Sequence, residues 1–134
     1  MSSEVGGWTF SGCYTDNSTS ILLGKTITTA EDGSTTETAG IGSMETTNYI
    51  DLTNYYMLSI STDQDSGFGI EGAVYLFSES DTATTNTATV MFDSAGATAI
   101  DVNDLTGKYK VKITSTTDTT GYYNFSVSKV MLYG

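Results

Sequence analysis

The stretch "DQDSG", residues 63–67, has the side-chain chemistry of a cation-binding loop. Asp63 and Asp65 place two carboxylates one residue apart, directly before a glycine, and calcium takes oxygen ligands from loops of this kind. The glutamate that an EF-hand carries at its twelfth position is replaced by Val74. The spacing therefore predicts a structural calcium site at Asp63 and Asp65, and the alternative is a solvated hairpin loop.

The glycine string "GFGIEG", residues 67–72, matches the G-x-G-x-x-G pattern of dinucleotide sites. In those sites a helix follows, and its N-terminus holds the pyrophosphate. Here the string is followed by "AVYLFS", which is β-branched and aromatic, and the downstream acid that binds the ribose is missing. We reject a dinucleotide site and expect no cofactor other than the calcium ion.

Catalytic side chains are scarce in this sequence. The 16 carboxylates contain enough acids for a glycosidase pair, but most of the aspartates lie in turn sequences, where they accept backbone hydrogen bonds. The chain has no histidine and no arginine, and no nucleophile stands beside a base. We expect a protein that is not an enzyme, with a carboxylate-based glycan hydrolase as the weakest alternative.

The nine tyrosines are the most suggestive binding residues. A tyrosine combines a flat apolar face with a polar tip, which suits sugar rings and protein partners. In the adjacent pairs 55–56 and 122–123, one ring of each pair must point away from the core if the segment is extended. The alternative is that these rings only cover the ends and the outer surface of the fold. The candidate ligand-binding residues are Tyr75, Phe77, Tyr122 and Tyr123.

The charge excludes two classes of partner. A net charge of -11 repels phosphate, so we expect no nucleic-acid partner and no binding to anionic membranes. No stretch approaches the roughly 18 apolar residues of a membrane span. The N-terminal "MSSEVGGWTF" lacks the basic and apolar regions of a signal peptide. The single cysteine, Cys13, has no disulfide partner within the chain, and we expect a small strand residue rather than a reactive thiol.

Strands must position these residues, because apolar side chains recur at a spacing of two. The segment "FGIEGAVYLF" is apolar on both faces, which predicts a central strand. In "KYKVKIT", residues 108–114, lysines alternate with apolar residues and face water, and such a row often protects a sheet edge. The last strand changes its apolar phase between Val127 and Val130, which indicates a bulge near Ser128.

The first third of the chain predicts three more strands, in "WTFSGCY", "ILLGKTI" and, more weakly, "ETAGIGSM". Residues 1–134 are long enough for a single domain with one core. Together the segments predict an all-β fold, an antiparallel β-sandwich (jelly roll) of about eight to nine strands. The expected core contains Trp8, Leu58, Ile60, Ile70, Val74, Leu76, Tyr109, Val111, Ile113 and Val127.

An Ile-Asp motif occurs twice, in "IDLTNY" at 50–55 and in "IDVNDLTGKY" at 100–109. The apolar residues of each copy can close one end of a sandwich. The polar residues Asp51, Thr53, Asp101 and Asn103 can cap one helical turn before the next strand. We interpret the motif as a corner with an architectural role.

The segments "YIDLTNYYMLSIS", "GAVYLFSES", "TATVMFD", "AIDVNDLTGKYKVKIT" and "VSKVMLY" resemble a known group of domains. These are the jelly-roll, carbohydrate-binding-module-like β-sandwich domains of phage tail and virion proteins, and of surface proteins, from Gram-positive gut bacteria. The resemblance spans about residues 49–134 and rests on corners and core positions rather than on ligand contacts.

The resemblance implies a domain that attaches to a surface or builds a virion. The expected function is a non-enzymatic phage virion surface module that binds host cell-surface carbohydrate, and the alternative is a capsid or tail decoration protein without a glycan ligand. Such a protein is made in the cytoplasm, is released by lysis and works on the virion or outside the cell. The expected partners are a host surface glycan or other virion proteins, in a homo-oligomer or array whose avidity exceeds the affinity of one copy.

Overall fold

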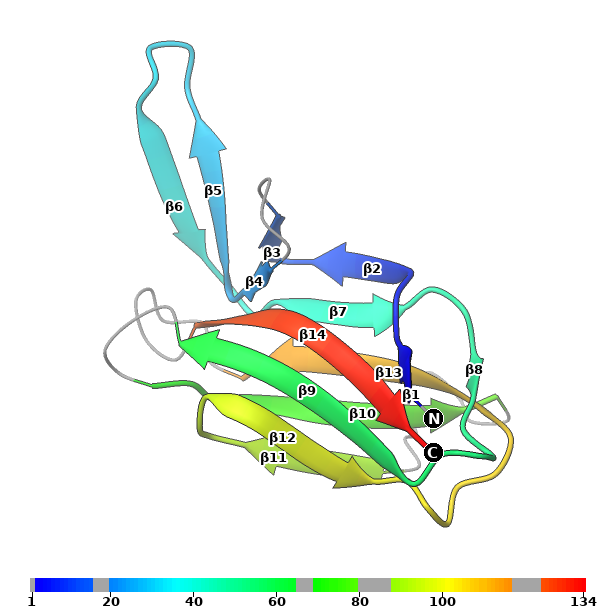
Figure 1. Cartoon of the computed structure of the whole chain (residues 1–134). Coiled ribbons are helices and arrows are strands. Elements are labelled where there is room, and N and C mark those ends of the chain that lie inside the picture. Colours follow the sequence, from blue (N-terminus) through cyan, green and yellow to red (C-terminus); the bar gives the residue numbers. More distant parts are fainter. Residues whose placement is uncertain (1, 16–19, 65–68, 80–87, 117–123) are drawn as a thin grey trace.

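The chain folds as a sandwich of two antiparallel β-sheets with a projecting hairpin (Figure 1). The computed structural model describes residues 2–15, 20–64, 69–79, 88–116 and 124–134. The regular elements of this part of the chain are fourteen strands, so the expected fold class is confirmed and the strand number is higher than expected. In the same residues no helix is long and apolar enough to cross a membrane.

The first sheet, sheet A, has six strands in the order β12-β9-β14-β4-β3, and β1 pairs with β14 outside this path. The register of β14 on β9 shifts between Val127 and Lys129, which confirms the bulge expected near Ser128. The strands of sheet A are β1 (Ser2–Glu4), β3 (Cys13–Thr15), β4 (Ile21–Leu23), β9 (Met57–Gln64), β12 (Gly96–Asp101) and β14 (Phe125–Tyr133).

The second sheet, sheet B, also has six strands, in the order β11-β10-β13-β7-β2, and β8 pairs with β13. The expected central strand, β10, lies between β11 and β13, so this prediction is confirmed. β13 carries the lysine row and is interior as well, so the idea that its lysines protect a sheet edge is wrong. The strands of sheet B are β2 (Trp8–Ser11), β7 (Ser43–Thr46), β8 (Ile50–Asp51), β10 (Gly72–Ser78), β11 (Ala88–Phe92) and β13 (Lys108–Ser115).

A two-stranded hairpin of β5 (Lys25–Thr29) and β6 (Thr35–Ala39) extends away from the sandwich (Figure 1). Its polar threonines face water, and Lys25 and Glu37 form an ion pair across it at 3.4 Å. The Lys25 side chain is largely covered and that of Glu37 is half exposed, and a pair at the surface contributes about 0–1 kcal/mol. The turn between the strands is closed by Asp32, which accepts hydrogen bonds from the backbone N and the hydroxyl of Ser34.

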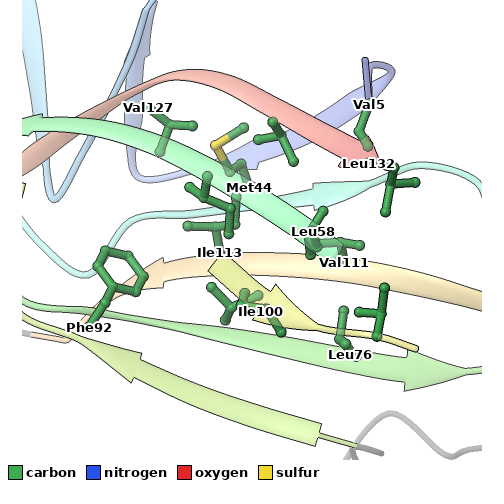
Figure 2. Close-up of a cluster of buried hydrophobic side chains, with 14 of the residues drawn as sticks. Val5, Met44, Leu58, Leu76, Phe92, Ile100, Val111, Ile113, Val127 and Leu132 are labelled. Atoms are coloured by element: carbon green, nitrogen blue, oxygen red, sulfur yellow. The ribbon is translucent and has the colours of Figure 1, made fainter. Parts of the chain in front are cut away.

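The inner faces of both sheets fill one core, in which Figure 2 shows side chains of the two sheets meeting. Every residue expected in the core is buried except Trp8, which is only partly buried and packs at the margin of the core. The expectation for Trp8 was therefore wrong, because β2 is the edge strand of sheet B and its inner face is not fully covered. Burying each large aliphatic side chain contributes about 1.5–3 kcal/mol.

Three glycines account for three of the additional strands, and the short strands β1 and β8 are further ones. Gly12 separates β2 in sheet B from β3 in sheet A, Gly24 separates β4 from the hairpin strand β5, and Gly42 precedes β7. The three backbones meet at one point, the glycine junction: a Cβ on Gly12 would lie 2.6 Å from the carbonyl oxygen of Ile41, and one on Gly42 would lie 2.5 Å from that of Gly12. Each of the three strands expected in this third of the chain is therefore divided between two sheets.

The two Ile-Asp motifs form corners, as expected. Asp51 Oδ1 accepts a hydrogen bond from the backbone N of Thr53, and Asp101 Oδ1 accepts one from that of Asn103, both at 2.9 Å. The hydrogen bonds from Thr53 hold the pKa of Asp51 below its ordinary value. In each copy the residue after the aspartate, Leu52 or Val102, is fully buried. Each corner thus joins a polar turn on the surface to an apolar anchor in the core.

The two corners also bind each other. Leu52 donates its backbone N–H to the carbonyl of Gly107 at 2.9 Å, and Gly107 donates its own N–H to the hydroxyl of Thr53 at 2.8 Å. Val102 in turn donates to the carbonyl of Tyr56 at 3.1 Å. The motif is repeated because two corners, one before β9 and one before β13, close the same end of the sandwich.

Cys13 lies next to the glycine junction on β3. Its thiol donates to the carbonyl oxygens of Ser43, at 3.1 Å, and Ser11, at 3.4 Å. Burial raises the pKa of the thiol above its ordinary value, against the smaller lowering effect of these hydrogen bonds. A raised pKa leaves less thiolate, the reactive form, so the geometry agrees with a structural role for Cys13.

Replacing Gly24 by alanine should destabilise the protein more than replacing Gly33. Both residues have a positive φ, +93° and +86°, so each substitution costs about 1–2 kcal/mol in backbone strain. A Cβ at Gly24 would also collide with the side-chain amide of the buried Asn124, whereas one at Gly33 has nothing within 4 Å. We expect Gly24→Ala to cost about 1–3 kcal/mol more in urea unfolding. Equal losses for the two variants would show that the glycine junction is not close-packed.

Cys13 should react slowly with a thiol reagent in the folded protein. Its raised pKa lowers the thiolate fraction at any pH below that pKa, so the alkylation rate should keep rising above pH 8 in the native state. In denaturant the rate should increase and level off near the pKa of a free thiol, about 8.5. A native rate equal to the denatured rate at pH 8 would contradict the buried position.

Candidate functional site

The outer face of sheet B carries an aromatic pair on β10. Val74 and Leu76 point into the core, so Tyr75 and Phe77 point to the opposite side, where both are partly exposed. Their rings stack with centroids 6.3 Å apart and an interplanar angle of 27°. The sequence prediction thus placed these two residues on the correct side of the strand, and the structure brings them together.

The lysine row of β13 lies directly beside this pair. In the antiparallel register Tyr75 is opposite Lys112 and Phe77 is opposite Lys110. Lys110 Nζ lies 3.9 Å from Glu45 Oε1 on β7 and 5.1 Å above the centroid of the Tyr49 ring. The ion pair contributes about 0–1 kcal/mol and the cation–π contact about 0.5–1 kcal/mol at an exposed site. These weak contacts orient Lys110 without burying it.

We call this surface the aromatic–lysine face. It spans the neighbouring strands β10, β13 and β7 and the loop after β7. Two aromatic rings lie on β10, ammonium groups lie on β13, and a carboxylate on β7 and a third aromatic ring in the loop lie on the far side. Such a surface can stack on a flat ring and hydrogen-bond to the groups at the edge of that ring. Its members are Tyr75, Phe77, Lys110, Lys112, Glu45 and Tyr49.

A hollow elsewhere on the molecule, the Trp8 groove, was not predicted from the sequence. It has a volume of about 190 Å³ and lies between β2 and the bulge of β14, where Trp8, Phe10 and Met44 form much of its wall. Phe10 is 42% exposed. Trp8 and Phe10 follow an alternating pattern that also predicts core residues. The signal that could have identified the groove is the shortness of β2. A strand of only four residues between two glycines brings few neighbouring side chains against its own tryptophan.

A second hollow, of about 540 Å³, lies beside Tyr56, near the carboxylate of Asp101 and the amide of Asn103. Tyr56 is 52% exposed, while its neighbour Tyr55 packs against the core. This confirms that one ring of the pair points outward. The hollow is shallow, and Asp101 already accepts the hydrogen bond of its corner.

Three of the predicted site residues, Asp65, Tyr122 and Tyr123, lie outside the described residues. Asp63 is exposed at the end of β9, opposite Ser126. In the described ranges no group of three or more histidine, cysteine, aspartate or glutamate side chains is placed to hold a metal ion. The calcium site at Asp63 and Asp65 therefore stays a prediction.

No protein-family model matches the chain, and no curated protein matches it. Among solved structures, a family two carbohydrate esterase from Cellvibrio japonicus is 13% identical with a TM-score of 0.49, covering 100% of this chain and 34% of the esterase. The chain thus spans about a third of the length of that enzyme. Two further solved structures that resemble this chain are carbohydrate-binding modules. CBM51 from Clostridium perfringens, in complex with methyl-galactose, is 9% identical with a TM-score of 0.45, covering 98% of this chain and 99% of the module. TmCBM61, in complex with beta-1,4-galactotriose, is 13% identical with a TM-score of 0.49, covering 98% of this chain and 91% of that one. At these identities the similarity concerns the β-sandwich fold.

Proposed function

We propose that the protein is a non-enzymatic surface module of a phage virion that attaches by binding host cell-surface carbohydrate through the aromatic–lysine face. The observation that carries this proposal is the stacked pair of Tyr75 and Phe77, held beside hydrogen-bonding ammonium groups on the water-facing side of a sheet. Stacked rings on the outer face contribute nothing to the core, which lies on the other side of β10. Their position suits a flat ligand.

The charges of this face favour binding over hydrolysis. Glycoside hydrolysis requires two carboxyl groups on either side of the scissile bond. The aromatic–lysine face contains one carboxylate, Glu45, and Lys110 lies within ion-pair distance of it. The whole chain has no histidine that could act as a base. The module therefore holds a glycan without cleaving it.

The virion assignment rests on the sequence resemblance described above. A virion protein leaves the cell by lysis, so its route to the host surface needs no signal peptide. Copies in a homo-oligomer or array would then bind a repeated glycan together, and this avidity compensates for a weak single site.

Replacing Tyr75 or Phe77 by alanine should abolish retention of the protein on host cell-wall polysaccharide. Each substitution removes half of the stacked pair, and because the side chains lie on the outer face, the melting temperature should change little. Tyr56→Ala, at the exposed tyrosine beside Asp101, is the matched control and should retain binding. Loss of binding in Tyr56→Ala alone would place the site at that hollow instead.

The alternative function, a decoration protein that packs against other virion subunits, is favoured by the free edge of sheet A. Among the strands that the structure describes, β12 ends the sheet and pairs only with β9. Its outward side chains Ala97 and Ala99 are small and exposed, and the strand contains no lysine or proline, the residues that commonly protect an edge. If β12 paired in antiparallel fashion with β12 of a second copy, the two Asp101 carboxylates would lie at opposite ends of the paired strands and would not face each other.

Ala99→Lys should weaken self-association of the protein at least tenfold, because a lysine opposes edge-to-edge pairing. The dissociation constant can be measured by analytical ultracentrifugation, with Ala30→Lys in the projecting hairpin as the control of equal charge. A parent protein that stays monomeric at every concentration, or an equal effect of both lysines, would contradict pairing through β12.

A further inference from the structure

The lysine row on β13 is unexpected in so acidic a chain. The protein has a net charge of -11 and five lysines, of which Lys108, Lys110 and Lys112 alternate along this one strand. β13 pairs with β10 on one side and with β7 and β8 on the other. Edge protection therefore does not account for the row, and 16 carboxylates already provide the charge that solubility requires.

Each of the three lysines lies opposite or beside an acidic residue. Lys108 lies opposite Asp51 of β8 in the strand register, and Lys110 lies 3.9 Å from Glu45. Lys112 lies opposite both Tyr75 and Glu45, but in the described part of the chain no carboxylate comes within 4 Å of its ammonium group. Lys110 and Lys112 therefore share the carboxylate of Glu45, which leaves one positive charge among these three described residues.

The position of Lys112 relative to the rings defines what this charge can contact. Directly opposite residues of antiparallel strands have Cβ atoms about 4.5–5.5 Å apart, so the stem of Lys112 begins beside the ring of Tyr75. A sugar ring that stacks on Tyr75 and Phe77 therefore presents the substituents at its edge to the ammonium group. A carboxylate at that edge would form a charge-assisted hydrogen bond, which is about twice as strong as a neutral one.

We infer that the aromatic–lysine face binds a saccharide with an isolated carboxylate, a sugar of the uronic acid class, whose ring stacks on Tyr75 and Phe77 and whose carboxylate pairs with Lys112. This inference rests on the proposed glycan-binding function and specifies its ligand. The carboxylate is isolated because, among the described residues, Lys112 supplies one positive charge that has no carboxylate within 4 Å. A densely charged chain, with a phosphate, sulfate or carboxylate on every unit, would be repelled by the remaining charge of the protein.

The inference is tested on a panel of glycans in which each oligosaccharide with one uronic acid residue is paired with its carboxyl-reduced form. The parent protein should bind the acidic member of at least one pair about tenfold more tightly than the reduced member. Lys112→Gln should remove this difference and keep the affinity for the reduced form. Lys25→Gln, which removes the same charge from the hairpin, should behave like the parent. Binding of the acidic form should weaken between about 0.05 M and about 0.5 M salt in the parent but not in Lys112→Gln.

Each outcome decides between the two proposals. Equal affinity for the acidic and reduced forms, or an acid preference that survives in Lys112→Gln, would overturn the inference while the glycan-binding function stands. Preferential binding to polygalacturonate or to a phosphate-containing polymer would also overturn it. Failure to bind any glycan on the panel, with melting temperatures unchanged, would overturn the proposed function together with the inference.

Discussion

The pairing of β10 with β13 is the constraint on which both the core and the candidate site depend. Seven residue pairs, from Gly72 opposite Ser115 to Ser78 opposite Tyr109, fix one register. That register sends Val74 and Val111 inward, and it sends Tyr75 and Lys112 together to the outer face. A slip of one residue would exchange the two faces of the slipped strand, burying ammonium groups and exposing the core. The hydrophobic effect that folds the sandwich therefore also assembles the aromatic–lysine face.

Alternation predicted this part of the fold well because the two sides of these strands differ sharply in polarity. In β9 and β13, serines or lysines alternate with large apolar residues, and the structure buries the expected side in both. The first third of the chain was predicted less well, since its apolar period continues across Gly12 and Gly24 although the chain changes sheets there. Positive φ and close backbone contact at a glycine are tertiary features, and the spacing of side chains does not report them.

The candidate site could be predicted in part for the same reason. Tyr75 and Phe77 stood out because β10 is apolar on both faces, and a second apolar face must meet something other than the core. The residues that lie beside this pair were not predictable from the sequence, because they come from a distant strand. Lys112, which lies opposite Tyr75, follows it by 37 residues in the chain. The same lysines were assigned to a sheet edge because strand order is not visible in a single strand. Trp8 was assigned to the core because alternation does not distinguish an interior strand from an edge strand with an open flank.

The two outer faces of the sandwich differ in chemistry, and this difference allows both proposed interactions to occur at once. Sheet A presents the small exposed side chains Ala97 and Ala99 on β12, which is its edge strand in the described part of the chain. Sheet B presents the stacked rings of β10 and the lysines of β13. A module that assembles through sheet A would leave sheet B open to a glycan, with all copies facing the same kind of ligand. Glycan binding and virion assembly then place demands on different strands, and a substitution on β12 should leave the chemistry of the aromatic–lysine face unchanged.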